Sequence, residues 1–277
     1  MPLPPVRLRR DRCPGVLRPW PADDGALIRL RLAGGHLPAG SLEILAQVAY
    51  DHGDGQVYLT GRANLQLRAL PFVDGQLPDE VVDAVVRTGL LPSRSHELAR
   101  NLMCSPLTGI SGGRADLRPV VRELDERLCA LPGLAALPGR FLFVLDDGRG
   151  DLVDRETDLG AVVLDADTAQ LRVGAGWGAV VPLSDVAEEL VQLAHRFLRA
   201  RGHDETAAWH VAEVESPLAP PAPGDARVPA ASGIPSYDGV LHLPVPDGVL
   251  TPDLVGELVG PGHDLVVTPW HGVVVTP

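Results

Sequence analysis

The sequence predicts an α+β fold in which two repeated halves pack as one pseudo-symmetric unit, with an α/β domain between them in the chain. The segment from Asp23 to Arg68 contains an alternating apolar stretch, then a stretch with helical period, then a stretch rich in β-formers. The same order recurs from Tyr237 to Val275. The residues between the copies have mixed helix and strand character. A proline- and glycine-rich stretch then leads into the second copy, as is typical of a linker.

The two copies correspond position by position. Asp24-Gly25 matches Asp238-Gly239, the turn at Gly34-Gly35 matches Asp247-Gly248, and Thr60 matches Thr268. Two such halves tend to bury their sheets against each other, so we expect a cleft between them for a large ligand. The copies differ in polarity, however, because only the first closes on arginine and amide side chains. We therefore expect only the first half to hold an anion.

The predicted domains follow from these boundaries. They are a first half-domain with an N-terminal arm (1–91), an α/β domain (92–215), a linker (216–233) and a second half-domain (234–277). In the α/β domain we expect a compact loop at 100–110, a helix at 115–131, and strands at 140–147, 160–167 and 178–183. A last helix at 183–202 has Ser184 as its expected N-cap and Gly202 beyond its end.

Composition limits the function classes. The net charge of −12 argues against nucleic-acid binding, and no apolar run approaches the roughly 20 residues that a membrane crossing requires. All 24 basic residues are arginine, which suits carboxylates or phosphates, although a biased base composition of the genome explains the excess as well. Three cysteines without CxxC spacing favour a reducing compartment, so we expect a cytoplasmic protein.

No metal site is assigned from the sequence. The nine histidines show no HxH or HxxxH spacing. An acidic run follows the strand expected at 140–147, and metal binding is one interpretation of it. A solvated turn is the favoured one, because aspartate and glycine together are typical of turns. The members of the run are Asp146, Asp147, Asp151, Asp154 and Asp158.

Four segments together resemble one known family. Leu59–Arg68, Arg100–Ile110, Leu137–Gly148 and Val266–Val275 have the order and spacing of motifs in the nitrite and sulfite reductase family. Arg12–Pro19 and the short middle domain make the chain most similar to the precorrin-3B synthases, the oxygen-dependent enzymes of aerobic cobalamin biosynthesis. The resemblance covers nearly the whole chain and implies that the two repeats are ferredoxin-like half-domains.

The resemblance implies a binding site for a flat tetrapyrrole with several carboxylates. That ligand is siroheme in the reductases and the substrate precorrin-3A in the synthases. By the two-residue period of a strand, one face would carry side chains able to bind its carboxylates. They are Arg62, Asn64, Gln66 and Arg68. The pattern by itself suits the polar face of any half-buried strand equally well.

The same resemblance implies residues at the reacting side. Arg100 and Asn101 match the Arg-Asn pair of the family's motif. Asn101 joins the expected binding residues, and Arg100 and Arg140 are the catalytic candidates. Without the resemblance, Arg100 would be a surface residue capping the preceding helix. Leu142 stands where many reductases carry a second basic residue, which favours the synthase over a siroheme-dependent sulfite or nitrite reductase.

The resemblance also implies cofactors: a 4Fe-4S cluster held by four cysteines beyond the second repeat, and siroheme or non-heme iron. The cluster ligands are not present in this chain, whose cysteines are Cys13, Cys104 and Cys129. We expect a fragment or early-terminated product, a missing part supplied by another polypeptide, or a loss of redox function.

Two functions of different classes follow. The chain is expected to take part in oxygen-dependent hydroxylation of precorrin-3A, with a tetrapyrrole and an electron donor as partners, or to bind a tetrapyrrole without turning it over. A siroheme-dependent reductase is the weaker alternative. Neither nucleic acid nor membrane is an expected partner, and the oligomeric state stays open.

Overall fold

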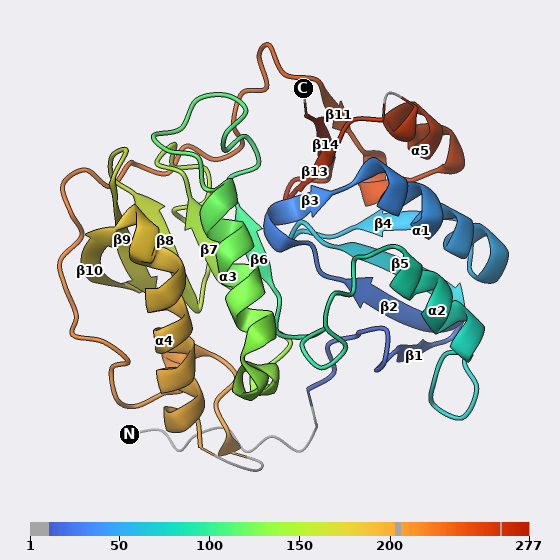
Figure 1. The fold of residues 1–277 in the computed structure, drawn as a ribbon, viewed down its shortest axis with the longest axis horizontal. Coiled ribbons are helices and arrows are strands. Elements are labelled where there is room, and N and C mark those ends of the chain that lie inside the picture. Colours follow the sequence, from blue (N-terminus) through green and yellow to red (C-terminus); the bar gives the residue numbers. More distant parts are fainter. Residues whose placement is uncertain (1–10, 203–205, 261, 277) are drawn as a thin grey trace. The chain divides into compact units, whose positions relative to one another are not determined.

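The computed structural model describes residues 11–202, 206–260 and 262–276. They form two compact units. Of the described residues, 13–100 and those from 236 onward form the repeat unit, and 11–12 and those between 101 and 235 form the inserted unit. The predicted α+β character is confirmed (Figure 1). Residues 1–10, where the expected N-terminal arm begins, lie outside the described part of the chain.

The repeat unit shows the predicted duplication as a matching order of elements. The first copy contains β2 (Gly25–Leu30), β3 (His36–Leu37), α1 (Ala39–His52), β4 (Val57–Leu59) and β5 (Leu65–Leu70). The second contains β11 (His242–Pro244), β12 (Val249–Leu250), α5 (Pro252–Val259), β13 (Leu265–Thr268) and β14 (Gly272–Val275). Outside the repeat, β1 (Trp20–Ala22) precedes the first copy and α2 (Asp79–Arg87) follows it.

The copies exchange their shortest strands. One sheet has the order β1-β2-β5-β4-β12 and the other β11-β14-β13-β3. Leu37 of the first copy pairs with Leu265 of the second, and Leu250 of the second pairs with Val57 of the first. Each two-residue strand therefore completes the sheet of the opposite copy, and neither sheet is complete without both ends of this unit's chain.

The turns before the exchanged strands have the same backbone geometry. Gly34 and Asp247 both have a positive φ, at 63° and 53°, within a short 3-10 turn. The next residue is Gly35 in one copy and Gly248 in the other, again with positive φ. A Cβ atom at Gly35 would overlap the carbonyl oxygen of Val267 on β13, so the crossing of the copies requires glycine there.

The turns that close each copy also match. The Thr60 hydroxyl oxygen accepts the amide of Asn64 at 3.2 Å, and the Thr268 hydroxyl oxygen accepts the amide of Gly272 at 3.1 Å. The residue before the donating amide, Ala63 in the first copy and His271 in the second, has a φ of 54° in both copies. The equivalence of Thr60 and Thr268 predicted from the sequence thus has a common structural role.

One hydrophobic core contains residues of both copies. Leu37, Leu45 and Leu67 from the first copy share it with Leu250 and Leu265 from the second, and each is fully buried. Helix α1 packs against both α2 and α5. Because the core is shared, we expect the two copies to unfold together.

The inserted unit is a mixed five-stranded sheet with two helices. Its strands are β6 (Leu102–Cys104), β7 (Phe143–Asp146), β8 (Leu159–Val163), β9 (Thr168–Val173) and β10 (Gly176–Pro182). β6, β7 and β8 pair in parallel and the others antiparallel. Helices α3 (Arg118–Ala130) and α4 (Val186–Ala200) pack side by side (Figure 1). Further 3-10 turns lie at Pro132–Ala136, Leu183–Asp185 and Val211–Glu213.

Two details of this unit differ from expectation. The segment 100–110 contains the strand β6 and is not only a loop. Ser184 does not cap α4, because a 3-10 turn that ends at Asp185 precedes the helix. The Ser184 hydroxyl donates to the Asp185 carboxylate instead. Gly202 lies past the helix with a φ of 76°, as expected for a left-handed helix terminus.

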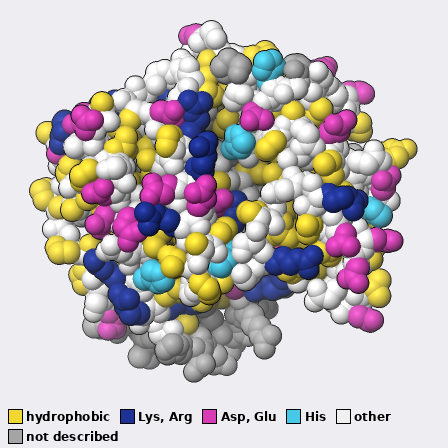
Figure 2. Space-filling model, viewed as in Figure 1, with side chains coloured by type: hydrophobic (Ala, Val, Ile, Leu, Met, Phe, Trp, Pro, Cys, Tyr) yellow, Lys and Arg dark blue, Asp and Glu magenta, His cyan; other side chains and the backbone are white. Residues whose placement is uncertain are grey.

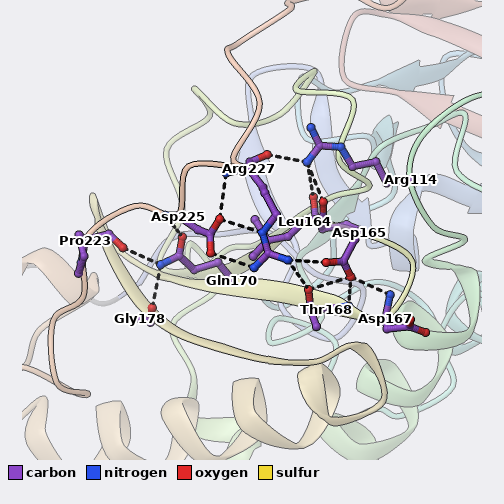
Figure 3. A network of polar contacts seen from close by, with 11 residues as sticks. Arg114, Leu164, Asp165, Asp167, Thr168, Gln170, Gly178, Pro223, Asp225 and Arg227 are labelled. Atoms are coloured by element: carbon purple, nitrogen blue, oxygen red, sulfur yellow. Dashed lines mark hydrogen bonds and ion pairs between the residues drawn. The ribbon is translucent and has the colours of Figure 1, made fainter.

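The stretch 216–233, expected to be a linker, lies against the inserted unit (Figure 3). The buried Gln170 amide on β9 donates to the carbonyls of Gly178 and Pro223 and accepts the amide of Asp225 at 2.8 Å. Arg227 forms ion pairs with Asp165 and Asp225. We call residues 216–233 the strap, because these contacts hold it to β9 and β10.

Surface and helix properties add little to the choice of partner. On the face shown in Figure 2, acidic and basic side chains are interspersed among apolar ones. Among the described residues, no helix has both the length and the hydropathy required to cross a membrane.

Candidate functional site

A polar face lies on the first sheet of the repeat unit. Along β2 and β5 the apolar side chains of Ile28, Leu30, Leu65 and Leu67 are buried in the core. Because strand side chains alternate, the residues between them lie on the opposite face. Arg29 on β2 is opposite Gln66 on β5, and Gln66 is opposite Tyr58 on β4. We call Arg29, Tyr58, Gln66 and Arg68 the arginine face.

The contacts of this face leave guanidinium hydrogens available. Arg29 Nη2 donates to Gln66 Oε1 at 3.3 Å. Arg68 lies 5.8 Å from the centre of the Tyr58 ring and 3.6 Å from a carboxylate oxygen of Asp24. The Nε atoms of both arginines are buried and have no hydrogen-bond partner among the described residues. Two converging strands thus present two unsatisfied charged donors.

The pKa values of two residues on this face are shifted by burial and by neighbouring charges. Burial lowers the pKa of Arg29; Cys13 opposes this effect and Arg62 adds to it by repulsion. Burial and the hydrogen bond to Asp54 raise the pKa of Tyr58 to about 12, so its hydroxyl stays protonated. The positive charge of Arg62 therefore acts on the Arg29 guanidinium.

The predicted shared face of Arg62, Asn64, Gln66 and Arg68 is only partly correct. Gln66 and Arg68 lie together on β5 and are half-buried. Arg62 lies in the preceding turn, because the positive φ of Ala63 interrupts the extended backbone. Asn64 is 1% exposed and its side chain accepts the amide of Leu32 at 2.9 Å. Asn64 therefore positions the end of β2.

Arg100 is buried in the repeat unit, so the expectation of a surface residue is wrong. Its Nη1 donates to the carbonyls of Arg31 at 3.5 Å and Leu90 at 3.4 Å. Arg31 in turn donates to the carbonyls of Pro14 and Glu97. These arginines hold backbone segments together next to the arginine face.

The other two predicted site residues belong to the inserted unit. Asn101 is buried and donates to the carbonyls of Gly139 at 2.7 Å and Phe141 at 3.2 Å, which fixes the entry to β7. Arg140, between those two residues, is exposed. Leu142 is buried, and its amide donates to Asp158 at 2.9 Å. Asn101 thus positions the loop that presents Arg140.

Comparison with known proteins finds a family model that matches part of the repeat unit. A family model described as "Nitrite/Sulfite reductase ferredoxin-like half domain" matches residues 21–74. Those residues form a nitrite/sulfite reductase ferredoxin-like half domain. The resemblance to this family inferred from the sequence motifs is therefore confirmed, and the matched segment contains all four residues of the arginine face.

Two relatives extend the comparison over most of the chain. A precorrin-3B synthase of Sinorhizobium sp is 29% identical over 263 residues, which covers 85% of this chain and 54% of the relative. The solved structure of the Mycobacterium tuberculosis NirA protein has a TM-score of 0.67 and 19% identity, over 95% of this chain and 59% of that one. The chain thus spans about half the length of the curated relative, and the NirA similarity concerns the fold.

The cysteines do not fit the iron-sulfur cluster known in this family. A 4Fe-4S cluster takes four thiolate ligands, and this chain has three cysteines. Cys104 is buried, and burial raises its pKa well above the ordinary value, while Cys13 and Cys129 are half-buried. No cysteine belongs to a potential metal-ligand group in the described part of the chain.

The acidic run differs from the expected solvated turn. Asp146, Asp147, Asp151 and Asp158 are buried, and of the run only Asp154 is exposed. The carboxylates turn inward because they accept backbone amides; Asp146, for example, accepts those of Gly148, Gly150 and Leu152. Burial raises the pKa of Asp151 to about 7, against the opposing hydrogen bond from Ser105.

Arg29 is a candidate that the sequence analysis did not name. The signal was present in ALIRLRL (Ala26–Leu32), where Arg29 and Arg31 alternate with apolar residues as Gln66 and Arg68 do on β5. What the sequence did not show is which strands of the half domain are neighbours. The pairing of β2 with β5 places Arg29 opposite Gln66.

Proposed function

We propose that this chain binds a tetrapyrrole carboxylate on the arginine face and acts as the tetrapyrrole-binding part of a precorrin-3B synthase-like oxidoreductase. The observation that supports this most directly is that the buried Nε–H groups of Arg29 and Arg68 have no acceptor in the described part of the chain. A buried charged donor without a partner is destabilising by about 1–3 kcal/mol or more, so such groups typically mark a ligand position.

The chemistry of the face suits a carboxylate. A guanidinium binds a carboxylate with two parallel hydrogen bonds, and each charge-assisted bond is stronger than a neutral one. Arg62 adds a third positive charge near Arg29. Gln66 fixes the Arg29 side chain, so that less conformational entropy is lost on binding.

The similarity to a precorrin-3B synthase supplies the proposed reaction. It is the oxygen-dependent hydroxylation of precorrin-3A at a ring-bridging carbon with lactone formation. In this proposal Arg140 is a catalytic candidate, and Arg100 acts by positioning the segments that it bridges. Because three cysteines cannot ligate a 4Fe-4S cluster, the cluster and its electrons come from another stretch of polypeptide.

Binding is tested by titrating the purified chain with uroporphyrin III, an eight-carboxylate tetrapyrrole, followed by absorption and fluorescence. We expect Arg29→Gln and Arg68→Gln each to weaken binding at least about tenfold, as loss of a charge-assisted hydrogen bond of about 1.5–3 kcal/mol predicts. Arg87→Gln is the matched control, because Arg87 is an exposed arginine of the same unit on α2. If all three variants weakened binding equally, the effect would come from the net charge of the protein, and the proposed site would be rejected.

Catalysis is tested separately from binding. Precorrin-3A, oxygen and a reductant are supplied to the chain with and without a four-cysteine domain from a complete synthase. Turnover only in the presence of that domain supports the oxidoreductase part of the proposal. Tight binding with no turnover under either condition supports the non-catalytic binding module instead.

A further inference from the structure

The loop that follows β7 buries three carboxylates together in the inserted unit. Asp146, Asp147 and Asp151 are each at most 1% exposed. Each offers one carboxylate oxygen, and these oxygens lie within 4.8 Å of one another. The loop is distinct from the arginine face, and nothing in the proposed function uses it.

Hydrogen bonds hold two of these carboxylates in place and leave room for another ligand. Asp146 Oδ1 accepts the amides of Gly148 and Gly150, while its Oδ2 accepts that of Leu152. Asp147 Oδ2 accepts Nη2 of Arg149, and neither Oδ2 atom accepts a second hydrogen bond from the described residues. Because each carboxylate oxygen has two lone pairs, Oδ2 of both residues keeps one for a further partner.

The third carboxylate has an oxygen with no donor at all. Ser105 donates to Asp151 Oδ1 at 2.6 Å, but Asp151 Oδ2 is buried and has no hydrogen-bond partner among the described residues. The nearest ion-pair contact of this oxygen is Arg149 Nε at 3.9 Å, beyond hydrogen-bond distance. The Asp151 side chain is 0% exposed, so bulk water does not solvate it either.

The charges in this loop do not balance. Among the described residues, the one guanidinium that is hydrogen-bonded to any of the three carboxylates is that of Arg149, and it donates to Asp147. Arg172 interacts electrostatically with Asp146, but its hydrogen bonds go to the carbonyls of Leu152 and Arg155. Buried negative charge of this kind requires a further positive partner.

We propose that Asp146, Asp147 and Asp151 bind a divalent cation through one carboxylate oxygen each. Oxygen donors without sulfur or imidazole select hard ions such as Mg²⁺, Mn²⁺ and Ca²⁺. These ions lie roughly 2.0–2.6 Å from their ligands, so opposite ligands are about 4–5 Å apart, and the observed spacing fits within that limit. The bound ion also compensates the unpartnered oxygen of Asp151.

The test uses the full chain after treatment with EDTA. Binding of Mn²⁺ is followed by the loss of its free-ion electron paramagnetic resonance signal, and Ca²⁺ and Mg²⁺ by the rise of the thermal midpoint. We expect one Mn²⁺ per chain, displaced by Ca²⁺ or Mg²⁺. Asp151→Asn keeps the side-chain shape and should weaken binding at least tenfold.

Asp154→Asn is the matched control, because Asp154 is an exposed aspartate three positions further along the same loop. It should change the affinity less than twofold. Equal losses in the two variants would mean adventitious binding to surface carboxylates and would overturn the proposal. Absence of binding by the wild-type chain at millimolar ion would also overturn it, and would leave a proton as the partner of Asp151.

A second measurement needs no variant, so a folding defect in Asp151→Asn does not affect it. Bound Mn²⁺ broadens the NMR signals of nearby amides. We expect those of Gly148, Gly150 and Leu152 to disappear first in the wild-type chain, because these amides donate to Asp146. Broadening that begins elsewhere would place the ion at another site and reject this one.

Discussion

Single residues show two different reasons for glycine in the repeat unit. Gly35 and Gly55 have nearly the same backbone conformation, with φ of 79° and 80°. A Cβ atom at Gly35 would overlap the Val267 carbonyl, whereas one at Gly55 would meet nothing within 4 Å. Gly55 therefore requires glycine for its backbone conformation alone, whereas Gly35 requires it also because β13 approaches closely.

We expect Gly55→Ala to lower the free energy of unfolding by about 1–2 kcal/mol, through the left-handed conformation alone. Gly35→Ala should cost about 3 kcal/mol or more, because β13 must also move away. Urea denaturation followed by circular dichroism measures both. Equal costs would show that β13 does not approach Gly35 closely in solution.

Glu97 makes the stability of the repeat unit depend on pH. Its carboxylate accepts the amides of Val16 and Leu17, yet burial has the larger effect and raises its pKa above 4.5. The folded state therefore binds the proton more tightly than the unfolded chain. The stability from this group is complete below pH 4.5 and is lost as pH rises through the higher folded pKa.

The variant Glu97→Gln removes this titration. We expect its free energy of unfolding, relative to that of the wild type, to increase as the pH rises from 4 toward neutrality. Urea denaturation at several pH values measures the difference. A difference that does not change with pH would show that the pKa of Glu97 is the same in both states.

At the residue scale, prediction from sequence failed for polar residues that are usually exposed but are buried here. The acidic run consists of turn-forming residues, and only the inward hydrogen bonds from the backbone explain why Asp146 and Asp151 are buried. That Gln66 and Arg68 share one face of a strand was predictable, because the two-residue period is visible in the sequence. Asn64 has the same spacing but bonds to Leu32, a contact between strands that no local pattern encodes.

At the scale of elements, the exchange of short strands joins the two copies into one folding unit. Leu37 on β3 and Leu250 on β12 hold equivalent positions in the opposite sheets, and both are 0% exposed. The helices were predictable because α1 and α5 follow the 3.6-residue period. The exchange was not, because strands of two residues have no period to detect.

We expect Leu37→Ala and Leu250→Ala each to cost about 2–5 kcal/mol, as for other buried leucines. Both should shift the same unfolding transition, because one core contains both residues. Leu190→Ala in α4 is the control, since this buried leucine belongs to the inserted unit. Urea denaturation with hydrogen exchange would reveal a second transition if the copies folded separately.

The strap depends on one buried amide. Gln170 bonds to Gly178, Pro223 and Asp225, so Gln170→Ala leaves several backbone groups without a partner (Figure 3). We expect trypsin to cut after Arg227 at least about tenfold faster in this variant, as loss of roughly 1–3 kcal/mol predicts. Gln192→Ala on the exposed side of α4 should leave the cleavage rate unchanged. An unchanged rate in Gln170→Ala would show that other contacts hold the strap.

At the scale of the whole molecule, one unit is inserted into the chain of the other. Residues 101–235 separate the two parts of the repeat unit, and each unit has its own sheets. The duplication and the intervening α/β segment were predictable because both copies keep their order of elements. The similarity to a precorrin-3B synthase covers 54% of that longer protein, so the chain spans about half of its length.

Because of the exchanged strands, the first copy cannot complete its sheet during synthesis until the second copy has been made. β4 ends at Leu59, but its neighbour β12 begins about 190 residues later, at Val249. At roughly 5–20 residues per second, the ribosome needs about 10–40 s to cover that interval. Throughout this time the edge of β4 lacks its partner, and an unpaired strand edge can pair with other chains. The emerging first half domain should therefore depend on a chaperone until the last residues of the repeat unit leave the ribosome.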